Sequence, residues 1–168
     1  MAHWRRFLVG AIGAASLVGA GTVSAGADQG DTLLQFDSMT PVTGSAVGTV
    51  NDRGLRGGGF PWAISTGTGQ VDQGVVEVDV TGLVIPVAPF NGKNPVGKFD
   101  AVLSCLTPGG VVNLSTGSFP ANAAGDSTIV DTVNVPSQCG SPELFVGATL
   151  GNGFVWFARS NAQVENAQ

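Results

Sequence analysis

Two carboxylates two positions apart are the residues here whose type and spacing come closest to a catalytic pair. Glu77 and Asp79 alternate with valines in the run 75–80. A strand places residues two apart on one side, about 7 Å from each other. Glycosidases use carboxylate pairs at such separations as acid and base. The same alternation is typical of any half-exposed strand, so a small carboxylate-dependent extracellular glycoside hydrolase is one alternative function.

The segment RGLRGGGFPW, residues 53–62, offers binding chemistry instead. Arg53 and Arg56 stand beside glycine amides, a composition typical of a small-anion nest, and Phe60 is available for stacking. The segment lacks the glycine spacing and the Lys-Ser/Thr pair of a phosphate loop. Three successive glycines are also typical of a turn or bulge in which the backbone approaches a neighbour closely. We expect a chain corner leading into a strand with a buried Trp62.

The stretch PFNGKNPVG, residues 89–97, carries proline, Asn-Gly and Asn-Pro turn signals around Lys93. These signals predict a protruding loop. Such a loop docks on a partner or enters a protease cleft in some proteins, so a secreted protease inhibitor is a second alternative, although most such loops are only connections. Together with Arg53, Arg56 and Phe60, Lys93 forms the candidate binding surface.

The residue inventory excludes several enzyme classes. The only histidine, His3, precedes the predicted signal cleavage site, and the chain has no tyrosine. Imidazole is the usual base beside a nucleophilic Ser or Cys and the commonest ligand of zinc and copper. A Ser-His-Asp hydrolase, a papain-like protease and a His-ligated metalloenzyme are therefore excluded. We assign no catalytic residue and expect no cofactor and no metal site.

The N-terminus has the layout of an export signal. Basic residues at 3–6 precede an apolar stretch at 7–23 and then small residues, which is the pattern of a cleaved secretory peptide. We place the cleavage after Ala27, with Ala25 as a second possible site. The pair Arg5-Arg6 leaves the general and the twin-arginine routes open. The expected location is extracellular.

Charge and cysteine count define the environment further. Without residues 1–27 the chain has five bases and twelve acids, a formal charge of −7. A nucleic acid or an anionic membrane surface would favour the opposite sign, so neither is an expected partner. In an oxidising compartment the two cysteines, Cys105 and Cys139, are expected to form one disulfide.

The fold class follows from the spacing of the apolar runs. Runs rich in Val, Ile, Thr and aromatic residues recur between Gly, Pro and Asn clusters, and no window has a helical period. We predict an all-β fold, a single antiparallel β-sandwich of about 8–10 short strands in residues 28–160, followed by a loose polar tail, 161–168. The predicted strands are 32–37, 45–50, 60–66, 74–81, 83–88, 98–105, 110–116, 127–135, 143–150 and 154–160.

Period-two alternation assigns faces to these strands. In 74–81 the predicted inner residues are Val76, Val78 and Val80. In 98–105 they are Phe99, Ala101, Leu103 and Cys105, and the predicted outer residues are Lys98, Asp100 and Ser104. A loop of Asn152 and Gly153 is expected to join the last two strands as a hairpin in which Thr149 faces Trp156 and Leu150 faces Val155.

Three segments carry a resemblance to a known family: GLRGGGFPWAI, GKNPVGKFDAVLSC and FVWFA. They resemble an uncharacterised family of small exported all-β proteins, mainly of actinobacteria and other soil microbes. A weaker similarity, in strand layout and in TGSAVGTV, is to the chordin-type domain, whose sandwich is superoxide-dismutase-like; without histidines, dismutase activity is not implied. We expect a secreted, non-enzymatic binding or structural protein whose partner is an extracellular ligand or a cell-wall or glycan surface.

Overall fold

The computed structural model describes residues 32–151 and 153–161 of the 168-residue chain. The predicted signal peptide, its cleavage site after Ala27 and residues 162–168 of the predicted tail lie outside the described residues. The first tail residue, Asn161, is held rather than loose. Its backbone N–H donates to Ser38 O at 3.0 Å, and its side-chain oxygen accepts a hydrogen bond from Thr40 Oγ1 at 2.7 Å.

The described part of the chain contains ten strands and one 3-10 helix, η1, and no α-helix. The elements are β1 (Thr32–Phe36), β2 (Met39–Pro41), η1 (Gly44–Ala46), β3 (Arg56–Gly57), β4 (Thr66–Asp72), β5 (Val75–Thr81), β6 (Lys98–Thr107), β7 (Gly110–Pro120), β8 (Ser127–Thr132), β9 (Gly140–Leu150) and β10 (Gly153–Ser160).

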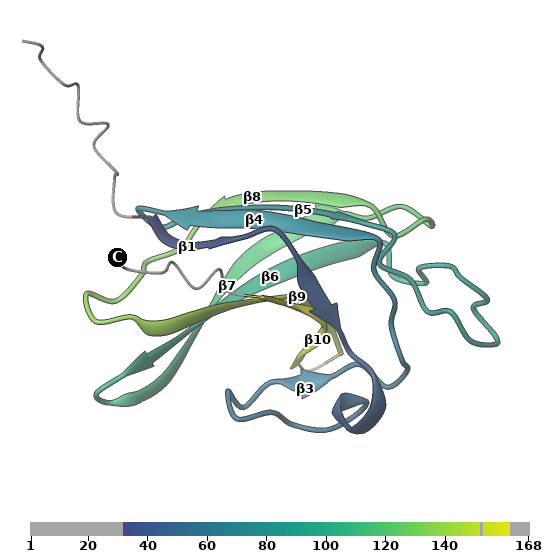
Figure 1. Cartoon of the computed structure of the whole chain (residues 1–168), viewed down its shortest axis with the longest axis horizontal. Coiled ribbons are helices and arrows are strands. Elements are labelled where there is room, and N and C mark those ends of the chain that lie inside the picture. Colours follow the sequence, from purple (N-terminus) through teal and green to yellow (C-terminus); the bar gives the residue numbers. More distant parts are fainter. Residues whose placement is uncertain (1–31, 152, 162–168) are drawn as a thin grey trace, which may run out of the picture.

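The strands form two sheets that lie face to face (Figure 1). One sheet has the order β1-β4-β5-β8, and the other has the order β2-β10-β9-β6-β7 with β3 added beside β10. All pairings are antiparallel except the short one between β3 and β10. The predicted antiparallel β-sandwich is confirmed.

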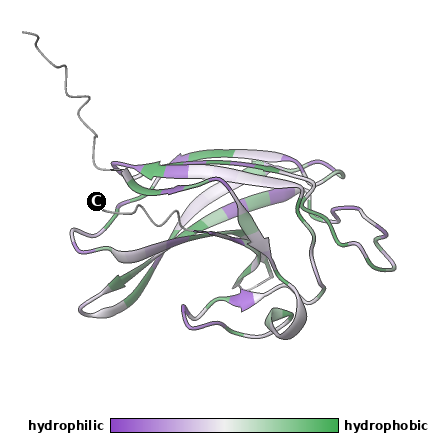
Figure 2. Cartoon of the chain, viewed as in Figure 1, coloured by the Kyte–Doolittle hydropathy of each residue, from purple (hydrophilic) through white to green (hydrophobic). Residues whose placement is uncertain are grey.

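The four-stranded sheet buries one face only. Val76, Val78 and Val80 of β5 are at most 1% exposed, as predicted, whereas Glu77 and Asp79 between them are exposed. Figure 2 shows the resulting change of hydropathy along the strands of this sheet. An alternating pattern of this kind is typical of a sheet with one face in the core and the other in water.

The six-stranded sheet is buried on both faces at β6. Phe99, Ala101, Leu103 and Cys105 are fully buried, as predicted. The prediction that Asp100 and Ser104 point into solvent is wrong, since they are 4% and 0% exposed. The chain between β2 and β4, which includes β3, lies across the side of this sheet that faces away from the other sheet (Figure 1). The Asp100 carboxylate is satisfied there by the N–H and the hydroxyl of Thr149, at 2.8 and 2.7 Å.

Trp62 is buried, as predicted, at 4% exposure. Its ring stacks on Phe157 with a centroid distance of 3.9 Å, and Phe157 meets Phe99 edge to face at 6.0 Å. Aromatic contacts of this kind contribute beyond the area they bury. The ring of Trp62 therefore joins the chain corner to the core of the sandwich.

Three predicted strands are wrong. Residues 45–50 contain the end of η1 and an irregular segment, with a single bridge from Val50 to Arg56. Residues 60–66 and 83–88 lie side by side through one antiparallel bridge, Ala63 to Val84. Neither segment forms a strand of its own, and Thr66 is the first residue of β4. Pro61 and Pro86 each remove a backbone donor from these segments, which is a reason for the short pairing.

Strand β4 was not predicted because its sequence, TGTGQVD, is poor in β-forming residues. Its glycines make room for side chains of β1, its neighbour in the same sheet, and of β2, which belongs to the other sheet. A Cβ on Gly67 would lie 2.6 Å from Met39 Cγ, and a Cβ on Gly69 would lie 2.7 Å from the Phe36 ring. The large side chains of β1 and β2 therefore occupy the space that β4 leaves empty.

The predicted hairpin of β9 and β10 is present, with a different register. Leu150 pairs with Gly153 and Thr149 with Phe154, in place of the predicted pairs of Leu150 with Val155 and Thr149 with Trp156. Gly151 has a φ of +60°, the conformation that a primed two-residue turn requires at this position. A Cβ on Gly147 would come within 2.8 Å of Val155 and Trp156 backbone atoms. Glycine at this position therefore permits the close approach of the two strands.

The predicted disulfide joins Cys105 in β6 to Cys139, just before β9. It closes a 34-residue separation in sequence and starts from a fully buried core position. A disulfide is consistent with an extracellular location. No helix in residues 32–151 and 153–161 is long and apolar enough to cross a membrane.

Replacing both cysteines, Cys105→Ser with Cys139→Ser, is expected to lower the free energy of unfolding by about 3–4 kcal/mol, because the unfolded chain gains the entropy of the open loop. Urea unfolding of the oxidised protein and the double variant measures this difference. Equal unfolding midpoints would contradict a stabilising role for the bridge.

Candidate functional site

The carboxylate pair lies on the open face of the four-stranded sheet. Glu77 accepts a hydrogen bond from Gln70 Nε2 at 2.8 Å on β4, and Asp79 accepts one from Thr128 Oγ1 on β8. Each carboxylate is thus tied to a different neighbouring strand, and both are exposed. A glycosidase needs its two carboxyls directed at one bond inside a substrate cleft. Outward carboxyls on a flat face do not support the hydrolase alternative.

An open depression of about 490 Å³ lies at the end of β5, with Asp79 and Asp126 in its lining and Glu77 outside it. Asp126 is engaged by its own loop: the N–H of Gly82 and the side-chain amide of Asn122 donate to its carboxylate, each at 3.0 Å. These hydrogen bonds, first that of Asn122, lower the pKa of Asp126. Its carboxylate therefore serves to order the turn. Among the described residues, no group of three or more His, Cys, Asp or Glu could hold a metal ion.

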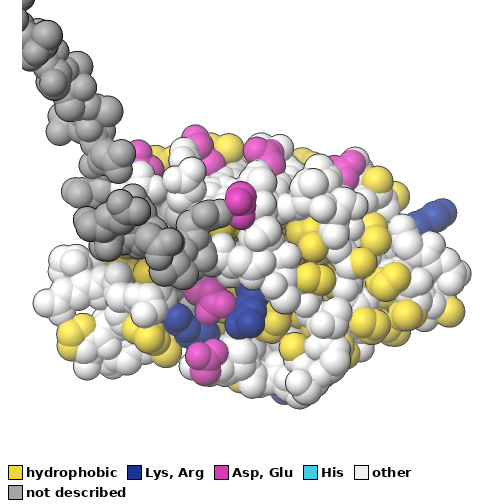
Figure 3. All heavy atoms as spheres, viewed as in Figure 1, with side chains coloured by type: hydrophobic (Ala, Val, Ile, Leu, Met, Phe, Trp, Pro, Cys, Tyr) yellow, Lys and Arg dark blue, Asp and Glu magenta, His cyan; other side chains and the backbone are white. Residues whose placement is uncertain are grey.

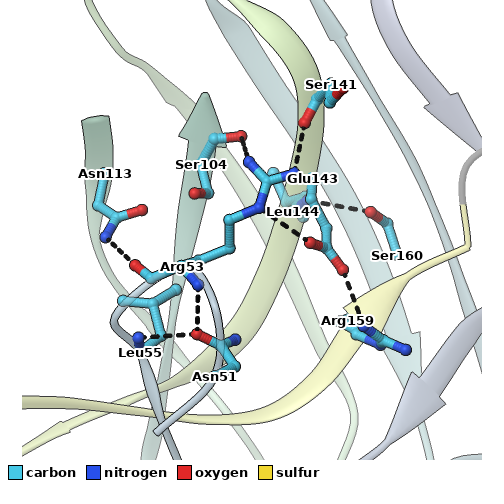
Figure 4. Close-up of polar contacts among 10 residues, drawn as sticks. All are labelled: Asn51, Arg53, Leu55, Ser104, Asn113, Ser141, Glu143, Leu144, Arg159 and Ser160. Atoms are coloured by element: carbon cyan, nitrogen blue, oxygen red, sulfur yellow. Dashed lines mark hydrogen bonds and ion pairs between the residues drawn. The ribbon is translucent and has the colours of Figure 1, made fainter. Parts of the chain in front are cut away.

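Arg53, predicted on an exposed rim, is buried at 7% exposure. Figure 4 shows its guanidinium directed at backbone carbonyls of two paired strands, those of Ser104 on β6 and Ser141 on β9. Nη2 donates to the carbonyl of Ser141 at 2.8 Å, and Nε lies 3.6 Å from the Glu143 carboxylate. The prediction is wrong because the charge is compensated inside the fold: Arg53 fastens the covering segment to the six-stranded sheet.

The backbone around Arg53 is ordered as well (Figure 4). The side-chain oxygen of Asn51 accepts hydrogen bonds from the N–H groups of Arg53 and Leu55, at 3.0 and 2.9 Å. The carbonyl of Arg53 accepts a hydrogen bond from Asn113 Nδ2 at 3.0 Å. Leu55 is itself buried at 8% exposure. This corner is a structural clamp rather than an open anion site.

Glu143 lies between two arginines, with Arg159 at 3.4 Å on its outer side. Burial raises the pKa of Glu143 above its ordinary value of 4.5, an effect that Arg159 and Arg53 oppose. The carboxylate is 18% exposed. Its ionised form is therefore held by the arginines in a place where burial disfavours charge.

Two glycines of the triplet at 57–59 permit close packing, Gly57 against backbone and Gly58 against side chains, whereas a Cβ on Gly59 would have no atom within 4 Å. A Cβ on Gly57 would lie 2.2 Å from the carbonyl oxygen of Ala46, and one on Gly58 would lie 2.7 Å from the Trp62 indole nitrogen. Arg56 remains exposed, and its guanidinium donates to the carbonyl of Gly48. The segment is the predicted chain corner, and it presents Arg56 but not Arg53 to solvent.

The structure brings Phe60 together with the predicted protruding loop. The rings of Phe60 and Phe90 meet edge to face with centroids 5.2 Å apart. Phe60 is 40% exposed and Val87 is 41% exposed. We call the surface formed by Phe60, Pro86, Val87, Pro89 and Phe90 the apolar tip. Figure 3 shows apolar side chains gathered at this end of the molecule, while the carboxylates on the same view lie over other parts.

The loop that carries the tip is a compact, closed turn. Ile85 and Lys93 form an antiparallel bridge, and Val87 O accepts hydrogen bonds from the N–H groups of Phe90 and Asn91, each at 3.0 Å. The buried Asn94 side chain fixes the base of the loop through Val96 O and Asn122 O. Lys93 remains exposed. An inhibitor loop needs an extended backbone that is free to pair with a protease, so this geometry does not support the inhibitor alternative.

The sequence analysis did not select the apolar residues that the loop contributes to this surface. It selected Phe60 and Lys93 but not Val87 or Phe90. A usable signal was present in PVAPF, residues 86–90: the prolines prevent a regular strand, so its apolar side chains have no sheet face on which to be buried. An apolar run that cannot be a strand or a helix is a signal for an exposed apolar loop.

Comparison with protein-family models, with curated proteins and with solved structures finds no match to this chain. The resemblance to small exported proteins and to the chordin-type domain therefore stays a prediction.

Arg53→Ala is expected to lower the free energy of unfolding by about 2–4 kcal/mol, because it leaves the mostly buried Glu143 carboxylate with one base fewer and removes the hydrogen bond to Ser141. Arg56→Ala is the matched control, with an expected cost below about 1 kcal/mol for an exposed arginine. Urea unfolding measures both. Equal costs would contradict the clamp.

Glu143→Gln is expected to change the pH dependence of stability. The folded protein holds the proton of Glu143 to higher pH than the unfolded chain, so this carboxyl's contribution is fully present below pH 4.5 and falls as pH rises through its raised folded pKa. The glutamine variant should therefore gain stability relative to the wild type over that rise. Unfolding curves across a pH series measure this, and a difference that is constant with pH would contradict it.

Proposed function

We propose that this protein is a secreted, non-enzymatic binding module whose ligand contact is the apolar tip. The observation that carries the proposal is the exposed contact of Phe60 with Phe90 on a closed, protruding turn. Exposed apolar patches on small soluble domains commonly mark interaction sites. The tip thus replaces the candidate surface that included Arg53.

The position of the tip in the fold supports this function. The loop is anchored at both ends, by the Ile85 to Lys93 bridge and by the Asn94 side chain, so its shape exists before a ligand arrives. A preformed surface avoids the entropy cost of ordering a loop on binding. The sandwich beneath then serves as a rigid support, which is the usual division of labour between loops and sheets.

The paired variant Phe60→Ala with Phe90→Ala is expected to reduce retention of the mature protein on a cell-envelope preparation by about tenfold or more, as truncation of central aromatic contacts does in other interfaces. The control is Leu106→Ala with Val111→Ala, which removes residues of 42% and 41% exposure from the turn of β6 and β7. Sedimentation with the envelope fraction measures retention, and far-ultraviolet circular dichroism verifies the fold. Undiminished retention of the folded tip variant would contradict the proposal.

A further inference from the structure

We propose that the ligand of the apolar tip is a lipid surface carrying anionic headgroups, into whose interface Val87, Pro89 and Phe90 insert. The inference rests on the proposed function and specifies its ligand.

The tip presents apolar side chains on a convex turn. Val87 is 41% exposed, Pro86 and Pro89 are exposed, and Phe90 is half-buried against Phe60. The sequence has no charged residue between Asp79 and Lys93. Figure 1 shows the loop between β5 and β6 projecting beyond the ends of both sheets. A protruding apolar turn can enter a fluid interface without requiring a matching pocket.

The backbone of the tip is prepared for a medium with little water. Five amide groups in residues 85–93 donate to carbonyls of the same loop: those of Ile85, Phe90, Asn91, Gly92 and Lys93. Pro86 and Pro89 have no amide hydrogen to satisfy. Unsatisfied backbone groups are the main obstacle to placing a loop in lipid. Five of the seven amide groups in residues 85–93 are satisfied within the loop, and those of Val87 and Ala88 at its apex are directed to the headgroup region, where water is available.

The charges behind the tip select an anionic surface. The chain has only two lysines, and both flank the end of this loop: Lys93 is exposed within it and Lys98 is exposed at the start of β6. Each basic residue near an anionic lipid surface contributes attraction that fades within a Debye length, about 8 Å at physiological salt. The overall negative charge led us to expect no membrane partner. That expectation treats the charge as uniform, whereas Glu77 lies on the open sheet face. Of the two carboxylates at the end of β5 where the loop begins, Asp79 accepts a hydrogen bond from Thr128, and Asp126 accepts hydrogen bonds from Gly82 and Asn122.

Other occupants fit the surface less well. Sugars need polar side chains beside an aromatic platform, but the amide group of the exposed Asn91 donates to Pro89 O at 3.2 Å, and that of Asn94 is committed to Val96 and Asn122. A second copy docked tip to tip would bring Lys93 towards its symmetry mate, a like-charge contact. The combination of apolar tip and flanking lysines is instead the composition that binds an anionic lipid interface.

The test is sedimentation of the mature, disulfide-bonded protein with vesicles of phosphatidylcholine alone and vesicles in which part of that lipid is replaced by phosphatidylglycerol. We expect binding to the anionic vesicles, reduced about tenfold in Phe60→Ala with Phe90→Ala, reduced by salt and by Lys93→Glu, and unchanged in Leu106→Ala with Val111→Ala. A Val87→Trp variant gives an independent readout, because the described tryptophans Trp62 and Trp156 are buried at 4% exposure. Its emission should shift to the blue on vesicle binding and lose sensitivity to aqueous iodide.

Three outcomes would overturn the inference. Absence of vesicle binding by the folded protein, or binding that ignores the tip substitutions, excludes a lipid ligand at this surface. Tip-dependent retention on lipid-free wall glycan or on an acidic protein, without vesicle binding, keeps the proposed function and replaces its ligand. Envelope retention that is independent of Phe60 and Phe90 overturns both proposals together.

Discussion

Burial of the central strands of the six-stranded sheet, β6, β9 and β10, on both of their faces is the constraint on which the rest of the structure depends. The four-stranded sheet covers one side through Val76, Val78 and Val80. The opposite side needs a separate cover, which the chain between β2 and β4 supplies. That segment is rich in glycine but buries Leu55 and Trp62, and an ion pair between Arg53 and Glu143 also helps to hold it. Arg53 is therefore buried, although its sequence is typical of a turn, because its segment covers the six-stranded sheet.

The same arrangement explains the setting of the two carboxylates that the sequence singled out. The outer face of the four-stranded sheet lies in water, and it carries Glu77 and Asp79 as an ordinary polar surface. Arg53 and Arg159 both form ion pairs with Glu143. The end of the sandwich where the 84–97 loop projects and Phe60 supports it is the surface that we propose for ligand binding.

The sequence predicted those features that depend on local pattern. Alternation in β5 and β6 identified the inner residues, and the cysteine count with the export signal predicted the Cys105–Cys139 bridge. Prediction failed where contact with a segment distant in sequence determines burial. The alternation places Ser104 on the outer side of its strand, yet Ser104 is buried beneath the segment that contains Arg53. It failed also for β4, whose glycines are explained only by the side chains of Met39 and Phe36 that they admit.

The candidate site was predictable to a similar extent and for similar reasons. Turn residues located the protruding loop, and Phe60 was selected by type. The contact of Phe60 with Phe90 joins segments that are 30 positions apart. It depends on the Ala63 to Val84 bridge, which no sequence pattern in either segment predicts. The role of Arg53 could not be read from its neighbours in sequence, because its acidic partner lies 90 positions away.

The most direct test of binding through the tip is hydrogen–deuterium exchange of the mature protein with and without saturating cell-envelope material. The account predicts added protection confined to residues 58–64 and 84–97, with β5 unchanged. Protection centred on β5 around Glu77 and Asp79, with none in the tip, would contradict it and return attention to the carboxylate face.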